Sequence, residues 1–246
     1  MDIERLRVYF NDPKTVEHYM KAVANVGLWE SERILFDRHF EMGDSLLDLG
    51  CGAGRITMVL KQLGFEEVVG ADLAEKMVTQ AKEIAGFLKV AVPFRVEDAT
   101  RMRFPSERFD GVIFGFNGLM QIPGRSNRRK AMQEVRRVVK PGGRFIFTTL
   151  DREDSFYATI FKDETNYAHD LSRNSQVLEY GDRHFETEHG ITFMHVPTRS
   201  EVLEDLEACD WERVDDCMRS EIADESPEVE AFSENCRFWV AKKPML

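Results

Sequence analysis

The sequence predicts an α/β protein in which a mostly parallel β-sheet lies between two layers of helices. Short apolar runs alternate with amphipathic segments of helical spacing between residues 45 and 150, as in repeated β–α–β units. The first of these runs ends in a turn with three alternating glycines, which lets backbone amides approach a ligand at the carboxyl end of the strand. The length of 246 residues fits a single domain.

Each expected element follows from its local pattern. Residues 13–40 carry two helical stripes of apolar residues that Gly27 interrupts, and Asp12 and Pro13 suit the start of the first helix. Strands of the main sheet are expected at 45–49, 67–71, 92–96, 110–115, 143–150, 211–218 and 236–241. Helices are expected between them at 55–63, 74–85, 125–139 and 202–208.

The regular alternation ends after residue 150. Residues 177–187 and 191–196 have strand-like patterns around His189 and Gly190, which predicts a small hairpin inserted after the fifth strand. Thr198 or Ser200 suits the N-cap of the helix that follows. The acidic segment 221–234 is expected to be a solvated loop.

The composition limits the classes of function. The net charge of −11 arises in the second part of the chain, because residues 1–150 carry 23 Lys and Arg against 20 Asp and Glu, whereas residues 151–246 carry 10 against 24. Nucleic acids bind basic surfaces, so this distribution argues against nucleic acid as the main ligand. No apolar run approaches the ~18 residues of a membrane span, and the N-terminus lacks an apolar signal region. The four scattered cysteines form no CxxC pair, so a cytoplasmic protein without disulfides is expected.

The segment LLDLGCGAGR, residues 46–55, distinguishes between two classes of nucleotide-like cofactor. Nicotinamide dehydrogenases need a small residue at the end of G-x-G-x-x-G/A, where the helix packs closely on the strand. Counted from Gly50, that position is Arg55, which is too large. The observed pattern is D-x-G-x-G-x-G, at positions 48, 50, 52 and 54.

This pattern resembles the first motif of the class I S-adenosylmethionine (SAM)-dependent methyltransferases, and the resemblance continues through four further segments up to residue 150. It implies a three-layer Rossmann-like sandwich with a seven-stranded sheet whose last strand is antiparallel. It also implies that Gly50 and Gly52 approach the methionine part of SAM through their backbone, and that Asp48 orients the loop and the amino group of SAM. Cys51 and Gly54 belong to the same turn, where packing is the alternative role for both.

The second segment, VVGADLAEKM at 68–77, places Asp72 at a strand end, 22 residues after Gly50. A carboxylate there can accept hydrogen bonds from both ribose hydroxyls, and it can also cap the following helix. The resemblance implies that Leu73 and Met77 contact the adenine of SAM, although both suit the core as well.

The third segment, FRVEDA at 94–99, carries the adenine contacts by resemblance. Asp98 would accept from the exocyclic amine, and the backbone N–H of Ala99 would meet a ring nitrogen. An ordinary turn residue is the alternative for Asp98.

In the fourth segment, FDGVIFGFNG at 109–118, the resemblance implies that the carbonyls of Phe114 and Gly115 meet the amino group of SAM and that Asn117 lies near the acceptor. The segment lacks both the [DNS]-P-P-[YFW] motif and a following Pro-Cys pair. DNA-adenine, protein-glutamine and C5-cytosine methylation are therefore disfavoured. The fifth segment, VVKPGGRFIF at 138–147, is a tight turn that serves the fold.

Four side chains outside these motifs are candidate general bases. Histidine titrates near neutral pH, and His184, His189 and His195 all lie on or beside the predicted hairpin, while Tyr19 lies on the N-terminal helix. His195 and Tyr19 are the catalytic residues expected here, and a purely structural histidine is the alternative. No acidic cluster has the spacing of metal ligands, so no metal is expected.

These features predict one domain, residues 1–246, with a helical lid at 1–40, a SAM-binding core at 41–150, a substrate-side insertion at 151–197, and a C-terminal helix with the last two strands at 198–246. The leading hypothesis is methyl transfer from SAM to O, N or S of a small molecule, with S-adenosylhomocysteine as the second product and a monomeric or homodimeric enzyme. The alternatives are an RNA or protein methyltransferase, or a SAM-binding regulatory module without catalysis. Aromatic residues expected to wall the acceptor pocket are Tyr9, Phe10, Tyr19, Trp29, Phe156, Tyr157, Phe161 and Tyr167.

Overall fold

The computed structural model describes residues 2–161, 179–187 and 190–245 of the chain. The strands of the main sheet are β1 Ser45–Leu49, β2 Glu67–Asp72, β3 Phe94–Val96, β4 Phe109–Phe114, β5 Val139–Thr149, β8 Glu212–Met218 and β9 Arg237–Lys242, and those of the hairpin are β6 Asp182–Thr187 and β7 Gly190–His195. The helices are α1 Ile3–Phe10, α2 Pro13–Asn25, α3 Glu30–His39, α4 Arg55–Leu63, α5 Glu75–Leu88, the 3-10 helix η1 Gly118–Gln121, α6 Arg125–Val138, α7 Ser155–Phe161, α9 Arg199–Ala208, α10 Arg219–Ile222 and α11 Pro227–Phe232.

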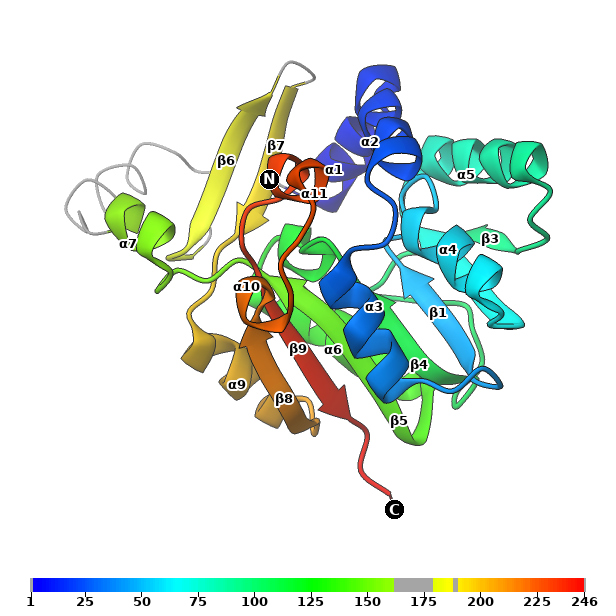
Figure 1. Cartoon of the computed structure of the whole chain (residues 1–246). Coiled ribbons are helices and arrows are strands. Elements are labelled where there is room, and N and C mark those ends of the chain that lie inside the picture. The colour runs from blue at the N-terminus through cyan, green and yellow to red at the C-terminus, as the bar shows by residue number, and fades with distance from the viewer. Residues whose placement is uncertain (1, 162–178, 188–189, 246) are drawn as a thin grey trace.

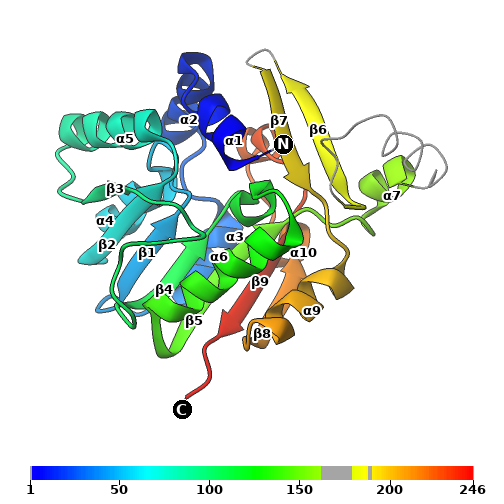
Figure 2. The ribbon, with the colours of Figure 1, turned by 180° about the vertical axis from the view of Figure 1, so that it is seen from behind.

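The main sheet has seven strands in the order β3-β2-β1-β4-β5-β9-β8. Strands β1 to β5 pair in parallel, whereas β9 runs antiparallel to both β5 and β8. Helices α3 and α4 lie in front of the sheet in Figure 1, and α6 and α9 cover the face seen in Figure 2. The predicted three-layer sandwich with an antiparallel last strand is therefore confirmed.

The two larger hydrophobic cores lie one on each face of the sheet and hold the layers together. Successive side chains of a strand point to opposite faces, so the buried strands divide their residues between the two cores. The core under α6 and α9 receives Leu47, Val112, Phe145, Phe147 and Trp239 from the sheet. The core under α3 and α4 receives Leu46, Val68, Ile113, Ile146 and Phe238.

Two predicted helix caps are confirmed. The Asp12 side chain accepts a hydrogen bond from the backbone N–H of Lys14 at the start of α2, where Pro13 occupies the first turn. Thr198 caps α9 in a reciprocal arrangement with Glu201, which has the geometry of a capping box. Helix α1 was not predicted, because it is short and Leu6 is its one buried residue.

The prediction of a loop at 221–234 is wrong, because this segment contains α11 and the end of α10. Ser226 caps α11 ahead of Pro227, and Val229 is buried in the core under α3. The Glu225 carboxylate accepts hydrogen bonds from the backbone N–H groups of Glu30 and Ser31 at the start of α3. Acidic residues of this segment thus hold an N-terminal helix through its unpaired amides, a role that charge composition alone does not predict.

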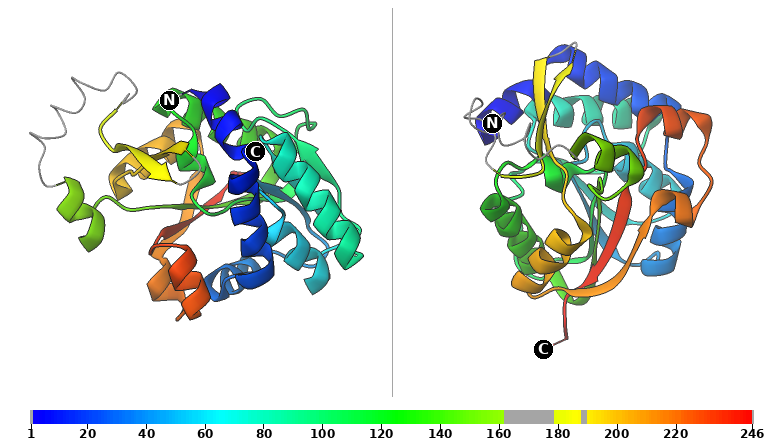
Figure 3. Two further views of the ribbon diagram at one scale, coloured as in Figure 1. Left: turned by 90° about the horizontal axis from the view of Figure 1, so that it is seen from above. Right: turned by 90° about the vertical axis from the view of Figure 1, so that its left-hand side faces the viewer.

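The hairpin β6–β7 is confirmed in its described residues. It packs beside α1, and both lie at the same end of the sheet as α2 (Figure 3). The expected residues His189 and Tyr167, and the start of the strand predicted at 177–187, lie outside the described residues. Among the described helices, none has the length and apolar character needed to cross a membrane.

A buried ion pair joins α3, through Glu32, to Arg55 at the start of α4. The Arg55 guanidinium donates to both carboxylate oxygens of Glu32 at 2.6 Å and to the carbonyl oxygen of Gly27 at 2.7 Å. It also lies 5.0 Å from the ring centre of Trp29, and the guanidinium of Arg219 lies 5.1 Å from the same ring. Trp29, which is fully buried, therefore links α3, α4 and α10.

Glu32→Gln should lower the free energy of unfolding by about 3–5 kcal/mol, because the substitution leaves the Arg55 charge buried without its partner. The amide oxygen of glutamine can still accept from the backbone N–H of Trp29, as Glu32 does. Urea unfolding measures the loss. Glu30→Gln, in an exposed pair with Arg33, is the control and should leave stability nearly unchanged. Equal effects of the two variants would contradict the assigned role of the buried pair.

Candidate functional site

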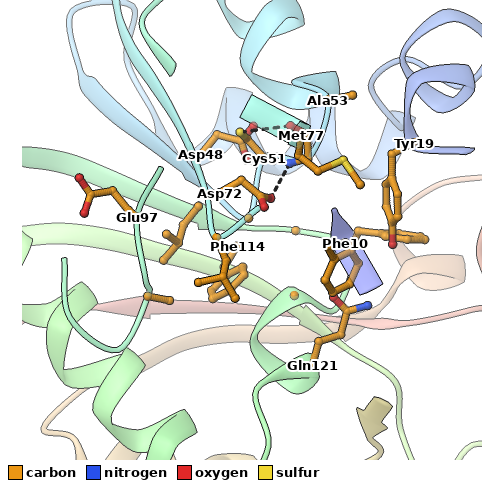
Figure 4. Close-up of a pocket in the computed structure, with 18 of the residues that line it drawn as sticks. Phe10, Tyr19, Asp48, Cys51, Ala53, Asp72, Met77, Glu97, Phe114 and Gln121 are labelled. Atoms are coloured by element: carbon orange, nitrogen blue, oxygen red, sulfur yellow. Dashed lines mark hydrogen bonds between the residues drawn. The ribbon is translucent and has the colours of Figure 1, made fainter. Parts of the chain in front are cut away.

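One cavity opens where β1, β2 and β4 end, beneath α1 and α2 (Figure 4). The space between its lining residues, including the open mouth, is about 1120 Å³. The sheet side of the cavity is formed by Asp48, Leu49, Gly50, Cys51, Gly52, Ala53, Arg55, Ile56, Asp72, Leu73, Met77, Glu97, Asp98, Ala99, Thr100, Phe114 and Gly115. The opposite side is formed by Ile3, Leu6, Phe10, Tyr19, Ala22, Phe116, Gly118, Gln121, Ile122 and Phe232.

The glycine turn after β1 brings bare backbone to this cavity. Gly50 and Gly52 line it with φ values of 68° and 53°, a region that residues with a side chain rarely adopt. A Cβ on Gly50 would lie 2.7 Å from the Phe114 ring. Gly54 is not among the lining residues: it begins α4 with φ 93°, and a Cβ there would lie 2.8 Å from Met58. Gly54 therefore has the packing role that was the alternative to a contact with the cofactor.

Asp48 connects the end of β1 to α4. Its Oδ2 accepts hydrogen bonds from the backbone N–H of Thr57 at 3.0 Å and from the Thr57 hydroxyl at 2.5 Å. Burial raises the pKa of the Asp48 carboxyl to about 7, against the lowering effects of Thr57 and the nearby Arg55 charge. The carboxyl lines the cavity and fixes the orientation of the glycine turn relative to the helix.

Asp72 performs the capping role considered above and still faces the cavity. One carboxylate oxygen accepts from the backbone N–H of Gly52 at 2.8 Å, and the other accepts from Ala74 N–H at 2.8 Å, at the start of α5. Burial raises the pKa of Asp72, while these backbone donors oppose the shift. Each carboxylate oxygen has two lone pairs, so both keep one for hydroxyl groups of a ligand.

The turn after β3 supplies the far end of the cavity (Figure 4). Asp98 and Ala99 both line it, and Asp98 Oδ1 accepts from the backbone N–H and the hydroxyl of Thr100, each at 2.8 Å. Asp98 therefore stabilises the turn and also lies at the cavity. Glu97, which we did not predict, is a buried lining residue whose carboxylate pairs with Arg103.

The loop after β4 carries backbone strain at the cavity. Phe116 and Asn117 have φ values of 49° and 58°, two successive side-chain-bearing residues in the left-handed region. The backbone N–H of Asn117 donates to the Thr148 hydroxyl at 2.7 Å, which holds this conformation. Phe116 lines the cavity, whereas Asn117 is buried and is not among the lining residues.

Of the two expected catalytic residues, the structure places Tyr19 at the cavity and His195 away from it. Tyr19 lines the cavity, and burial raises its pKa far above 10 against a smaller lowering effect of the Gln121 side chain, so the phenol stays protonated and acts as a donor. His195 is buried, with Nδ1 2.9 Å from Asp182 Oδ1, and is not among the lining residues. His184 is likewise absent from the lining, and burial lowers its pKa.

His195 belongs instead to a buried polar cluster at the base of the hairpin. Ligand-type atoms of Glu179, Asp182 and His195 lie within 4.8 Å of one another. Arg128 Nη2 lies 2.9 Å from Glu179 Oε1, so a guanidinium already balances this part of the cluster. Arg128 also donates to the Ile122 carbonyl oxygen, which connects the cluster to the loop that borders the cavity.

Residues 47–147 match the family described as "Methyltransferase domain". This part of the chain is similar to methyltransferase domains. A demethylmenaquinone methyltransferase from Symbiobacterium thermophilum is 33% identical over 143 residues, which cover 54% of this chain and 55% of that protein. The chain spans about half the length, or less, of the curated relatives that it matches.

Solved structures of methyltransferases share the fold of this chain. A SAM-dependent methyltransferase from Methanosarcina mazei superposes with a TM-score of 0.70 at 20% identity, covering 86% of this chain and 98% of that one. The 1,6-didemethyltoxoflavin-N1-methyltransferase of Burkholderia thailandensis, solved with 1,6-didemethyltoxoflavin and S-adenosylhomocysteine bound, superposes with a TM-score of 0.57 at 18% identity, covering 87% and 76%.

The raised pKa of Asp48 predicts a pH dependence of stability that Asp48→Asn removes. An aspartate titrates near 3.9 in the unfolded chain and at about 7 in the fold. Between these values the folded state holds a proton that the unfolded state has lost, so stability decreases as the pH rises from about 4 to about 7. The full difference is on the order of 4 kcal/mol.

Urea unfolding of both proteins at several pH values measures this effect. The unfolding free energy of the parent protein should fall relative to that of Asp48→Asn across this interval and run parallel to it above pH 8. Parallel curves throughout the interval would show that the pKa of Asp48 is not raised.

Proposed function

We propose that this protein transfers a methyl group from SAM to an O, N or S atom of a small molecule. The observation that carries the proposal is the convergence, at one cavity, of the glycine turn, the buried carboxylate of Asp72 and the Asp98–Ala99 turn. These features lie at the carboxyl ends of adjacent parallel strands, where α/β folds bind nucleotides. Fold alone does not imply activity, so the proposal depends on the site.

The chemistry of these groups suits SAM. Asp72 would bind the ribose hydroxyls with its remaining lone pairs, and Asp98 with the Ala99 backbone would bind the adenine edge. Leu73 and Met77 offer apolar surface for the adenine ring. The bare backbone of Gly50 and Gly52 would admit the methionine part of the cofactor. Cys51 would contact it as a neutral thiol, because burial raises its pKa well above 9.

When bound, SAM supplies a methyl group on a positively charged sulfur, and S-adenosylhomocysteine is the second product. The chain's own contribution is then to orient the acceptor and to exclude water. The cavity holds Tyr19 as a protonated donor. A carboxylate, a thiolate, a neutral ring nitrogen or an easily ionised hydroxyl would need no base from the protein.

A small-molecule acceptor is favoured by two observations. The acceptor side of the cavity is lined by mostly apolar side chains of α1, α2 and α11, which suit a small organic molecule. The demethylmenaquinone methyltransferase and the didemethyltoxoflavin methyltransferase both take their names from small molecules.

Asp72→Ala should weaken SAM binding by ~1–3 kcal/mol through the loss of hydrogen bonds to a carboxylate. Isothermal titration calorimetry measures the affinity. Asp37→Ala, on the exposed face of α3, is the matched control and should bind SAM like the parent protein. An unchanged affinity of a folded Asp72→Ala protein would remove Asp72 from the cofactor site.

Residues 1–40 would act as a lid, because α1 and α2 cover the cavity with Ile3, Leu6, Phe10, Tyr19 and Ala22. Removal of residues 2–11 should raise the SAM dissociation constant by about tenfold or more, since it uncovers apolar surface of the cavity. Circular dichroism checks that the shortened chain is folded. Unchanged SAM affinity and turnover in a folded, shortened protein would contradict the lid.

Formation of S-adenosylhomocysteine distinguishes the remaining alternatives. A SAM-binding module would bind SAM without releasing S-adenosylhomocysteine in the presence of any acceptor. An RNA or protein methyltransferase would release it with macromolecules and not with a library of small molecules. Tight binding of NAD(H) in the absence of SAM binding would overturn the proposal.

A further inference from the structure

The side of the cavity opposite the glycine turn has a distinct chemical character. We call it the acceptor wall, which consists of the lining residues from α1, α2, residues 116–122 and α11. None of its described members carries a charge, and most are apolar, as Leu6, Phe10 and Phe232 illustrate. The wall is built by segments that lie outside the common sheet.

Aromatic rings give the acceptor wall its shape. Tyr19 contacts the edge of Phe116 with ring centres 6.0 Å apart, and Phe10 packs against Tyr19 at 6.1 Å. Phe116 is stacked on Phe232 at 4.7 Å with nearly parallel planes. Phe116, whose backbone is left-handed, thus belongs to an array of aromatic rings that gives the acceptor wall aromatic surface.

Two polar side chains interrupt this apolar wall. The Tyr19 hydroxyl and the Gln121 amide face each other beside Phe10 in Figure 4, and the amide lowers the pKa of the phenol against the larger effect of burial. A primary amide has two N–H donors and an acceptor oxygen, and a phenol both donates and accepts. The two side chains together therefore have enough donors and acceptors to form a hydrogen bond with a ligand as well as with each other.

The charged residues that line the cavity all lie on its sheet side. Arg55 is paired with Glu32 and Glu97 with Arg103, whereas the carboxyls of Asp48, Asp72 and Asp98 accept hydrogen bonds from neutral donors at the strand ends. A charged acceptor that lies against the acceptor wall would therefore meet no opposite charge on that wall. Burial of an unpaired charge is strongly unfavourable, whereas a neutral flat molecule gains from the aromatic surfaces.

On the basis of the function proposed above, we infer that the acceptor is an uncharged, planar aromatic molecule whose polar substituent binds the Tyr19–Gln121 pair. The Gln121 amide donates to the phenol oxygen, and the Tyr19 hydroxyl donates to the acceptor. Both residues are positioning residues that select the acceptor and hold its reacting atom toward the glycine turn.

Three naphthalene probes, which share one ring system and differ in charge, test this inference. They are neutral 1-naphthol, anionic 1-naphthoate and cationic 1-naphthylmethylammonium, each titrated at pH 7 into the full-length protein saturated with S-adenosylhomocysteine. The neutral compound should bind at least about tenfold more tightly than either charged analogue. Tighter binding of a charged analogue, or binding of none of the three, would overturn the inference.

Tyr19→Phe and Gln121→Leu test the two positioning residues. Each should weaken 1-naphthol binding by about tenfold, the equivalent of one hydrogen bond, and leave the SAM dissociation constant unchanged. Tyr9→Phe, one residue before Phe10 and outside the cavity lining, is the control for Tyr19, and the exposed Gln62→Leu is the control for Gln121. Unchanged 1-naphthol binding by both test variants would overturn the role of the pair.

SAM binding separates this inference from the proposed function. A protein that binds SAM but prefers a charged probe refutes the neutral acceptor and leaves methyl transfer intact. A protein that binds no SAM refutes the proposed function itself.

Discussion

The buried ion pair between Arg55 and Glu32 determines how the outer segments meet the sheet. Arg55 is the first residue of α4, directly after the glycine turn, and its guanidinium reaches the α3 helix and the carbonyl of Gly27. The Trp29 ring lies between the guanidinium groups of Arg55 and Arg219, so the C-terminal α10 is held at the same point. Segments from both ends of the chain are thereby fixed beside the cavity, and their position depends on a charge pair that is stable only when both partners are present.

The cavity between the sheet and these outer segments has two chemically different halves. The strand ends provide carboxylates and bare backbone, which suit a nucleoside with hydroxyl and amine groups. The outer segments provide flat apolar rings with one phenol–amide pair, which suit a neutral aromatic molecule. Phe116 joins the halves: it lies two residues after the end of β4, and its ring contacts Tyr19 of α2 and Phe232 of α11. The backbone strain at Phe116 and Asn117 is compensated by the hydrogen bond from Asn117 to Thr148.

Local patterns in the sequence predict the elements and most of the lining residues at the strand-end side of the cavity. Alternating apolar runs, the D-x-G-x-G-x-G string and Asp72 depend on neighbouring residues, so they can be read from one segment. The acceptor wall depends on contacts between segments that are distant in the sequence. From the sequence, Arg55 shows only that the turn does not suit a dinucleotide. Its ion pair with Glu32 cannot be predicted, because Glu32 lies on another helix. Helices α1 and α11 are too short for a periodic signal, and the burial of His195 beside Asp182 is set by the hairpin's tertiary packing.

The central claim is that the glycine turn, Asp72 and the Asp98–Ala99 turn together bind SAM. A crystal structure of the protein with S-adenosylhomocysteine tests it most directly. The account predicts the ribose on the Asp72 carboxylate, the adenine beside Asp98 and Ala99, and the homocysteine part over Gly50 and Gly52. A ligand bound elsewhere, or with its ribose away from Asp72, would contradict the account.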